Sequence, residues 1–379
     1  MQKAEKRIVL ATPTMHGEEM TFVKDAFDKN WIAPLGFNCD NFETEISAYL
    51  AQGQSKEYHT LALSAGTAAL HLAMKLAGVG RGDVVFCSSM TFSATVNPVS
   101  YEGGVQVFID SERDTWNMCP EALEKAFKKY PHAKVVALAH LYGTPAKMDE
   151  ILDVCKKNNA ILIEDAAESL SATYKGRQTG TFGKYGVISF NGNKIITTSG
   201  GGMLITDDKA ARDKAFKWST QSREPAPWYQ HEEIGYNYRM SNVVAGIGRG
   251  QLIHLDEHKA KKAEIYRRYK EGLKDLPVSM NPYLDETEPN FWLSCMLIDE
   301  GVKVDPMTVL EKLNALNIET RPIWKPMHMQ PVFKGHDFIS VSDKPVCEDI
   351  FARGLCLPSD VKMTEQEQTF VIEAIKNCF

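Results

Sequence analysis

Three short polar segments, each directly after an apolar run, contain the residues best suited to chemistry. They are Ser64-Ala65-Gly66-Thr67, Glu164-Asp165-Ala166-Ala167-Glu168 and Ser189-Phe190-Asn191-Gly192-Asn193-Lys194. Each apolar run is typical of a buried strand, so each polar segment is expected at the carboxyl end of a strand. In sheets that are covered by helices on both faces, ligands bind at this edge. The three segments therefore predict one binding site.

The first two segments offer groups for an anion and for a cation. Gly66 and Thr67 stand where a helix is expected to begin, and backbone N–H groups there bind phosphate, although a plain helix N-cap has the same pattern. Asp165 and Glu168 suit a Mg²⁺ ion or a protonated ring nitrogen, or simply the dipole at a helix N-terminus. Neither segment alone decides between these alternatives.

Lys194 determines the chemistry of the third segment. Most single lysines are surface residues, but a partly desolvated lysine in a glycine-rich turn is a nucleophile for carbonyl groups. A phosphate cradle, a carboxylate and a lysine at one sheet edge are together the parts that pyridoxal 5'-phosphate (PLP) requires. The sequence therefore predicts a PLP site in which Lys194 forms a Schiff base and an acidic side chain of the second segment lies opposite the pyridine nitrogen.

The pattern of apolar residues predicts an α/β fold that positions these segments. The strand candidates are continuously apolar, which is typical of a mainly parallel central sheet covered by helices. The expected strands are His59–Leu63, Asp83–Cys87, Val105–Ile109, Lys134–Ala139, Ala160–Ile163, Tyr185–Phe190 and Met203–Thr206. The expected helices between them are Ala68–Leu76, Glu121–Tyr130 and Met148–Lys157.

A change of pattern beyond a long helix predicts a second domain. One long helix is expected over Asn242–Leu273, because this stretch contains no proline. After it, strands are expected over Phe291–Ile298 and Ile318–Arg321, and helices over Pro306–Leu316 and Thr364–Cys378. We therefore expect a large PLP-binding domain over residues 1–250 and a smaller α+β C-terminal domain over residues 251–379.

Composition and charge argue against several other classes of protein. The 379 residues are 44% hydrophobic with a net charge of -6, which disfavours a nucleic-acid surface. The eight cysteines form no C-x-x-C pair and no motif has metal-ligand spacing, so no metal site is expected. No stretch approaches the ~20 apolar residues of a membrane span, and no signal-peptide core is evident, so we expect a cytoplasmic protein without membrane contact.

Four segments resemble the DegT/DnrJ/EryC1/StrS sugar aminotransferases, which are PLP-dependent transferases of fold type I. They are Ser64–Leu70, Glu164–Glu168, Ser189–Lys194 and Gly235–Ser241, and the similarity extends over nearly the whole chain. Within this family, the sequence is most similar to the UDP-sugar 4-aminotransferases of bacillosamine and exopolysaccharide synthesis. The stretches that carry this closer resemblance are Trp31–Gly36, Phe190–Gly202, Gly235–Asn242 and Glu319–His328.

The resemblance implies a role for each residue near the cofactor. Lys194 would form the Schiff base and then move the proton, Asp165 would hold the pyridinium proton, and Glu168 would lie near the ring substituents and the substrate. Phe92 would stack on the ring, with ordinary core packing as the alternative. The residues implied to bind the phosphate are Gly66, Thr67 and Ser189.

The resemblance also implies a homodimer with shared active sites. Asn237 and Arg239 would reach the phosphate region from the partner subunit, with a surface helix start as the alternative. The residues implied to lie near the sugar are Trp31, Ile32, Ala33 and Pro34. The basic candidates for the nucleotide end are Arg321, Lys325 and His328. An interdomain hydrogen bond is the alternative for Arg321 and His328, and Trp324 is interpreted as a core residue.

We therefore predict transfer of an amino group from L-glutamate to the C4 keto group of a UDP-linked 4-keto-6-deoxy hexose. The product would be of the UDP-4-amino-4,6-dideoxy-GlcNAc type, used in glycan synthesis. Family members with histidine in place of the lysine eliminate water, so Lys194 favours the aminotransferase. The alternatives are a 3-keto sugar, a dTDP- or GDP-linked sugar, and a non-catalytic regulator that binds PLP or sugar. A nucleotide-dependent oxidoreductase is least favoured, because the glycine fingerprint is missing.

Overall fold

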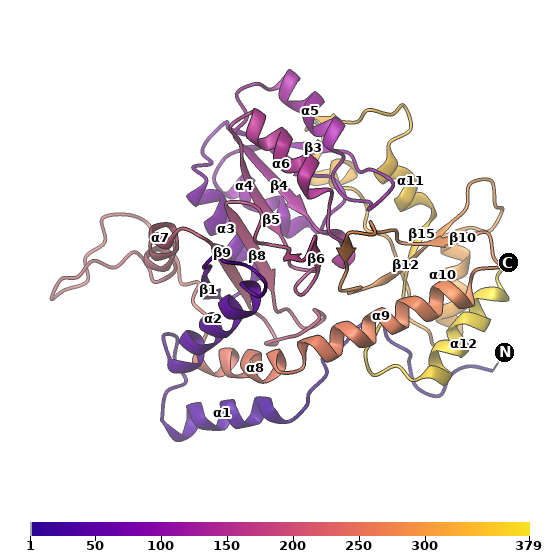
Figure 1. Cartoon of the computed structure of the whole chain (residues 1–379), viewed down its shortest axis with the longest axis horizontal. Coiled ribbons are helices and arrows are strands. Elements are labelled where there is room, and N and C mark those ends of the chain that lie inside the picture. Colours follow the sequence, from indigo (N-terminus) through magenta and orange to yellow (C-terminus); the bar gives the residue numbers. More distant parts are fainter. Residues whose placement is uncertain (1) are drawn as a thin grey trace.

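A central eight-stranded sheet forms the middle layer of the molecule (Figure 1). The computed structural model describes residues 2–379. In sheet order, the strands are β1 His59–Leu63, β9 Gly202–Thr206, β8 Tyr185–Ser189, β5 Ile161–Asp165, β4 Val135–Ala139, β2 Val84–Ser88, β3 Val105–Ile109 and β14 Phe338–Ile339. Neighbouring strands are parallel except that β9 runs antiparallel to β1 and β8. This confirms the mainly parallel sheet, and it brings the ends of β1, β5 and β8 to one edge.

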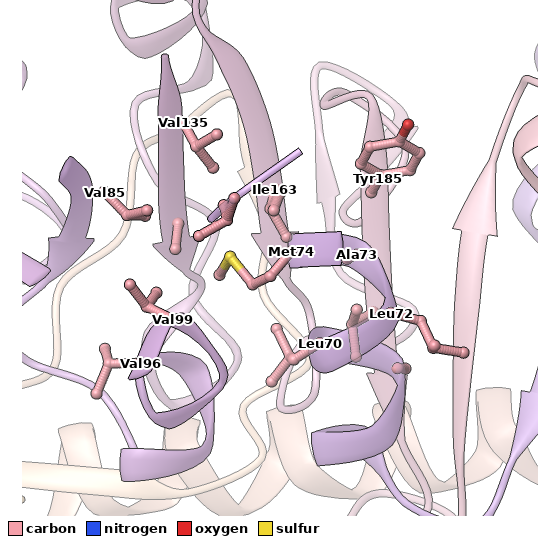
Figure 2. Packing of buried hydrophobic residues seen from close by; sticks show 14 of the residues in the cluster. Leu70, Leu72, Ala73, Met74, Val85, Val96, Val99, Val135, Ile163 and Tyr185 are labelled. Atoms are coloured by element: carbon pink, nitrogen blue, oxygen red, sulfur yellow. The ribbon is translucent and has the colours of Figure 1, made fainter. Parts of the chain in front are cut away.

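One face of the sheet is covered by α3 Gly66–Leu76, α4 Asn97–Tyr101 and α7 Lys209–Ser219. Figure 2 shows Leu70 and Met74 of α3 packed among Val85, Val135 and Ile163, which belong to three neighbouring strands. Burying each such side chain stabilises the fold by roughly 1.5–3 kcal/mol. This packing fixes α3 on the sheet, and its first turn therefore lies at the sheet edge.

The opposite face is covered by two pairs of helices. The first pair is α5 Pro120–Lys129 and α6 Met148–Lys157, which pack over β2, β3, β4 and β5. The second pair is α2 Phe37–Leu50 and α8 Asn242–Leu252, which pack over β1, β8 and β9. Outside α8 lies α1 Glu18–Asp28 (Figure 1). Three short strands form a separate small sheet: β6 Thr173–Tyr174, β7 Arg177–Gln178 and β11 Thr287–Glu288.

A smaller antiparallel sheet organises the C-terminal part, on the right of Figure 1. In sheet order, its strands are β10 Val278–Met280, β12 Ser294–Ile298, β15 Gly354–Leu357 and β13 Arg321–Pro322. The helices of this part are α9 Leu255–Gly272, α10 Pro306–Ala315, α11 Val346–Arg353 and α12 Glu365–Lys376. Buried residues of α9, α10 and α12 pack against β12 and β15 in a core of their own.

The chain path differs from the expected one in three places. The helix expected over Asn242–Leu273 is interrupted: α8 ends at Leu252 and a new helix begins at Leu255, after His254, whose φ of -103° and ψ of 8° are not helical. Ile318 pairs only with Ile8 in an isolated bridge, so that the strand expected from Ile318 begins at Arg321. Finally, β14 lies beside β3, so a segment of the C-terminal part completes the large sheet.

Candidate active site

A cavity of about 310 Å³ opens at the edge of the sheet where β1, β5 and β8 end. The loops after these strands, the start of α3, the segment after β2 and two tryptophans of the C-terminal part line it. The lining residues are Ser64, Ala65, Gly66, Thr67, Leu70, Phe92, Ala94, Asp165, Ala167, Glu168, Ser189, Asn191, Asn193, Lys194, Gly200, Gly201, Trp292 and Trp324. The fold thus brings together all three polar segments.

The start of α3 forms a narrow cradle of backbone and small side chains. Ala65 is extended and Gly66 opens the helix, so the first N–H groups of α3 have no partner within the helix. A Cβ atom on Gly66 would lie 3.1 Å from the Cβ of Ser189, and one on Gly202 would lie 2.3 Å from the Gly66 nitrogen. The two glycines therefore let the helix end approach the Ser189 hydroxyl, with Thr67 beside it, and a phosphate fits there.

Asp165 is the last residue of β5, and hydrogen bonds hold its carboxylate in one orientation. Thr95 Oγ1 donates to Oδ2 over 2.6 Å, and the Ala167 N–H donates to Oδ1 over 3.0 Å. Burial raises the pKa of the Asp165 carboxyl above its ordinary value, while these hydrogen bonds and the Lys194 charge lower it. A cation beside this buried carboxylate would be stabilised, so a protonated ring nitrogen fits here.

Lys194 lines the cavity from the loop after β8. Its Nζ lies 3.7 Å from Glu168 Oε1 and 4.1 Å from the centre of the Trp292 ring. The loop itself is held in place, because the Lys194 N–H donates to Asn191 O over 3.0 Å and Trp292 Nε1 donates to Asn193 O over 2.6 Å. The amine is therefore positioned between a carboxylate and an aromatic face.

Glu168 combines burial with contact to the lysine. Burial raises the pKa of Glu168 to about 7, although the Lys194 charge acts in the opposite direction. Its Oε2 accepts a hydrogen bond of 2.7 Å from the Tyr142 N–H, and Tyr142 adopts a φ of 52°, which is uncommon for a residue other than glycine. A carboxyl that titrates near neutral pH beside an amine is suited to exchange a proton with it.

The cavity fits PLP on three independent points. The glycine cradle at α3 accepts an anion, the oriented carboxylate of Asp165 suits a ring nitrogen, and Lys194 provides the amine. Phe92 has 56% of its surface exposed, and its ring centre lies 5.5 Å from that of Trp324. Core packing, the alternative for Phe92, would bury this ring, so its open face is available for a flat ligand.

The two residues expected to act across a subunit interface lie in different surroundings. Asn237 is exposed, on the segment that leads into α8. Arg239 is buried, and its Nη1 donates to Glu43 Oε1 over 2.7 Å and to Ala62 O over 2.8 Å. The guanidinium is thus engaged inside its own subunit, and neither residue belongs to the described lining of the cavity.

The expected sugar-binding segment lies beside the start of α8, outside the cavity lining. Trp31 and Ile32 are exposed, the Asn242 N–H donates to Ala33 O over 3.1 Å, and Pro34 forms a bridge with Ser241. The segment is therefore attached to the large domain with its apolar side chains facing outward.

The three basic candidates for the nucleotide end also lie outside the cavity lining. Arg321 is exposed and pairs with Glu319 over 3.0 Å, and Lys325 is half-buried. His328 hydrogen-bonds to Ser89 Oγ over 2.7 Å and to Glu348 Oε1 over 3.1 Å. The contact of His328 with Ser89, which follows β2 of the large sheet, corresponds to the alternative of an interdomain hydrogen bond.

Three residues at the site have no local signal in the sequence. Thr95 orients Asp165 from the short helix after β2, and Trp292 lies against Lys194 from the segment before β12. Trp324 packs against a buried hydrophobic cluster, in line with its interpretation as a core residue, and it also lines the cavity. These residues come close only through the tertiary fold, and no spacing along the chain reveals their proximity.

The sequence profile of the DegT/DnrJ/EryC1/StrS aminotransferase family matches residues 13–376. The chain is 48% identical to the putative pyridoxal phosphate-dependent aminotransferase EpsN of Bacillus subtilis (strain 168), over 99% of this chain and 96% of that protein. It is 35% identical to the GDP-perosamine synthase of Caulobacter vibrioides, over 97% of both chains.

Solved structures agree with this relationship. An aminotransferase of the same family from Brucella abortus superposes with a TM-score of 0.87 at 26% identity, over 95% of both chains. DesI, solved in the presence of its TDP-sugar product, superposes with a TM-score of 0.89 at 25% identity, over 100% of this chain and 94% of that one. Among residues 2–379, every helix is too short or too polar to span a lipid bilayer.

Proposed function

The chain belongs to the DegT/DnrJ/EryC1/StrS aminotransferase family, and from this premise we propose that it transfers an amino group from L-glutamate to the C4 keto group of a UDP-linked 4-keto-6-deoxy hexose. Its cofactor is PLP, and its general activity is that of a sugar aminotransferase. The observation that carries the proposal is the convergence of Asp165, Glu168 and Lys194 beside the glycine cradle.

The residues of the chain divide the chemical work between them. When bound, PLP supplies a conjugated ring that withdraws electrons from the carbon at which the amine is exchanged. Asp165, oriented by Thr95, holds the proton on the ring nitrogen and so keeps the ring electron-poor. Gly66 and Ser189, which lie close together, would hold the phosphate and so position the ring relative to the lysine.

Lys194 and Glu168 form the proton-moving pair of the proposed reaction. With PLP bound, Lys194 Nζ would take the proton from the amino-bearing carbon of the donor and deliver it to the cofactor carbon that keeps the amine. With the keto sugar it would move a proton in the reverse direction, to the C4 carbon of the sugar. Glu168, at 3.7 Å and with a pKa near 7, buffers the charge on this amine in both directions. Trp292 covers the amine and limits the access of water to it.

The choice of a UDP-linked 4-keto sugar rests on the close similarity of four sequence stretches to enzymes that use such sugars. Two relatives favour other nucleotides as alternatives, because one is named a GDP-perosamine synthase and DesI was solved with a TDP-sugar product. A further relative, 30% identical over 90% of this chain, is named a pleiotropic regulatory protein of Geobacillus stearothermophilus. The presence of all three residues of the catalytic cluster argues against a purely regulatory role here.

A homodimer with shared active sites is part of the proposal. The loop after α7 projects from the body of the subunit (Figure 1) and carries Trp228, Tyr229 and Ile234, of which Ile234 has 81% of its surface exposed. Large apolar side chains on a projecting loop are typical of an interface. Asn237 follows this loop directly, where contact with a partner subunit would bring it close to a second cavity.

A panel of keto sugars tests the proposed substrate. PLP-loaded protein would be incubated with L-glutamate and with 4-keto-6-deoxy and 3-keto hexoses on UDP, GDP and dTDP, and amino-sugar products would be measured by mass spectrometry. We expect the UDP-linked 4-keto sugars to give the highest kcat/KM. Amination of only GDP- or dTDP-linked sugars, or of only 3-keto sugars, would contradict the proposed substrate specificity. The assignment as a sugar aminotransferase would still hold.

A further inference from the structure

A fully buried asparagine lies beside the catalytic cluster without belonging to the described lining of the cavity. Asn290 is part of the segment between β11 and β12, and its backbone N–H donates to Gly143 O over 3.2 Å, in the segment after β4. Its side-chain amide is bonded at both ends, because Nδ2 donates to two carbonyl oxygens and Oδ1 accepts a backbone N–H. A buried amide with these partners fixes the position of whatever it contacts.

The nitrogen of this amide holds the loop that carries Glu168. Asn290 Nδ2 lies 2.7 Å from Glu168 O and 2.8 Å from Leu170 O. Carbonyl oxygens only accept hydrogen bonds, so the nitrogen of the amide, and not its oxygen, must face this loop. The two N–H groups of one side chain therefore hold the loop after β5 at two points.

The oxygen of the same amide holds the residue that covers Lys194. Asn290 Oδ1 accepts a hydrogen bond of 2.9 Å from the Trp292 N–H, and Phe291 between them has a φ of 49°, so an asparagine side chain closes a tight turn. Trp292 Nε1 donates to Asn193 O over 2.6 Å, and the Trp292 ring centre lies 4.1 Å from Lys194 Nζ. One residue thus connects the amide to the loop of the lysine.

A buried lysine of α9 fixes Trp292 from a third direction. Lys262 Nζ donates to Trp292 O over 2.9 Å and to Ser359 O over 2.6 Å. The backbone N–H, the carbonyl and the indole N–H of Trp292 are therefore all bonded. The three residues from Asn290 to Trp292 form one fixed unit between the loop after β5 and the loop after β8.

The segment after β4 packs against the same amide. A Cβ atom on Gly143 would lie 1.9 Å from Asn290 Oδ1, and the φ of 91° at Gly143 also favours glycine. The neighbouring Tyr142 N–H donates to Glu168 Oε2 over 2.7 Å. The backbone and the carboxylate of Glu168 are therefore both held by groups that contact Asn290 or lie next to such a group.

We propose that Asn290 is a positioning residue of the amino transfer, which keeps the Glu168 carboxylate 3.7 Å from Lys194 Nζ. This role rests on the proposed function, in which these two groups move the proton. A misplacement of 1 Å can slow a reaction about 100-fold. Asn290 lies outside the cavity lining, so its loss should slow the proton transfer without weakening the binding of PLP or of the amino donor.

The half-reaction of PLP-loaded protein with L-glutamate tests this role without any sugar. Asn290→Asp keeps the shape of the side chain but replaces both donors by an oxygen that repels the two carbonyls. Asn290→Ala leaves space that water can fill at this polar site, so it should fold even if Asn290→Asp does not. In single-turnover kinetics, we expect the limiting rate to fall by about 10–100-fold.

Binding and geometry give two further measurements on the same variants. The glutamate concentration for half-saturation and the Kd of PLP should change by less than about threefold, since only the limiting rate depends on the proton transfer. In crystal structures of the variants, the distance from Glu168 Oε1 to Lys194 Nζ should be longer than in the wild-type protein by about 1 Å.

Asn281→Ala is the matched control. Asn281 is also a buried asparagine of the C-terminal part, and its bonding partners there are Cys295 and Tyr266. This variant should lower the Tm but keep the wild-type rate. Rates within about twofold of wild type in the Asn290 variants would overturn the proposed role, as would an equal loss of rate in Asn281→Ala or an unchanged distance between Glu168 and Lys194.

Failure of the proposed function would give a different result. A wild-type protein that binds PLP but does not react with glutamate would contradict the proposed donor. The distance in the crystal structures of the Asn290 variants does not depend on the donor, and it would then decide the role of Asn290 by itself.

Discussion

The cofactor wall and the outer rim of this molecule are built in different ways. The cofactor wall, formed by Asp165, Glu168 and Lys194, is buried, and its side chains contact one another or oriented hydrogen-bond partners. The outer rim, formed by residues 31–34 together with Arg321 and Lys325, is exposed or half-buried and lies outside the cavity. From this difference we infer that buried residues at the edge of the sheet determine the reaction. The choice of sugar nucleotide is determined by exposed surfaces, which form a complete site only with a bound substrate or a second subunit.

Removal of the lysine should have the largest effect. Lys194→Ala deletes the only amine among the described lining residues, so we expect a loss of kcat of at least about 10⁴-fold, the upper range for a proton-transferring group. Single-turnover kinetics with L-glutamate would measure it. Lys209→Ala, on the exposed surface of α7, is the matched control and should retain full activity. A Lys194→Ala protein with a tenth of the wild-type rate would contradict the assignment.

Neutralisation of Asp165 should have the second largest effect. Asp165→Asn keeps the shape and the hydrogen bond from Thr95 but cannot hold a protonated ring nitrogen, so kcat should fall by about 10²–10⁴-fold. The comparison is sharpened by Thr95→Val, which leaves the carboxylate in place but less well oriented and should cost less. If both variants lost activity equally, orientation rather than charge would be the important property.

Glu168 should make the stability of the protein freed of PLP depend on pH. Its pKa rises from an ordinary 4.5 to about 7, so between these values the folded protein retains a proton that the unfolded chain releases. The free energy of unfolding should therefore fall as pH rises from about 4.5 to about 7, by up to ~3 kcal/mol. Urea unfolding of wild type and Glu168→Gln would show this, because the variant should lack this component. Parallel pH profiles would contradict it.

The outer rim should give the smallest effect. Arg321 is exposed, so Arg321→Ala should raise the KM for a UDP-linked keto sugar by about fivefold at most and leave kcat unchanged. Initial rates over a range of sugar concentrations would separate the two constants. A large fall in kcat would place Arg321 among the groups that act in the transition state and would remove the distinction between rim and wall.

Much of the cofactor wall could be predicted from the sequence, because local patterns encode it. An apolar run that ends at Asp165, or that precedes Ser189, marks both a buried strand and its carboxyl edge. The contributions of Thr95 and Trp292 could not be predicted, since each reaches the site from a distant part of the chain. The break before Leu255 was also missed, because no proline marks it and only the non-helical backbone of His254 separates the two helices.

The most direct test of the central claim is the visible spectrum of the PLP-loaded protein during a half-reaction in each direction. L-glutamate would be titrated in first, and a UDP-linked 4-keto-6-deoxy hexose would be added after removal of the excess. We predict that glutamate abolishes the absorption band of the lysine-bound cofactor and that the keto sugar restores it. A band that glutamate leaves unchanged, or that no nucleotide-linked keto sugar restores, would contradict the assignment of this cavity to sugar amination.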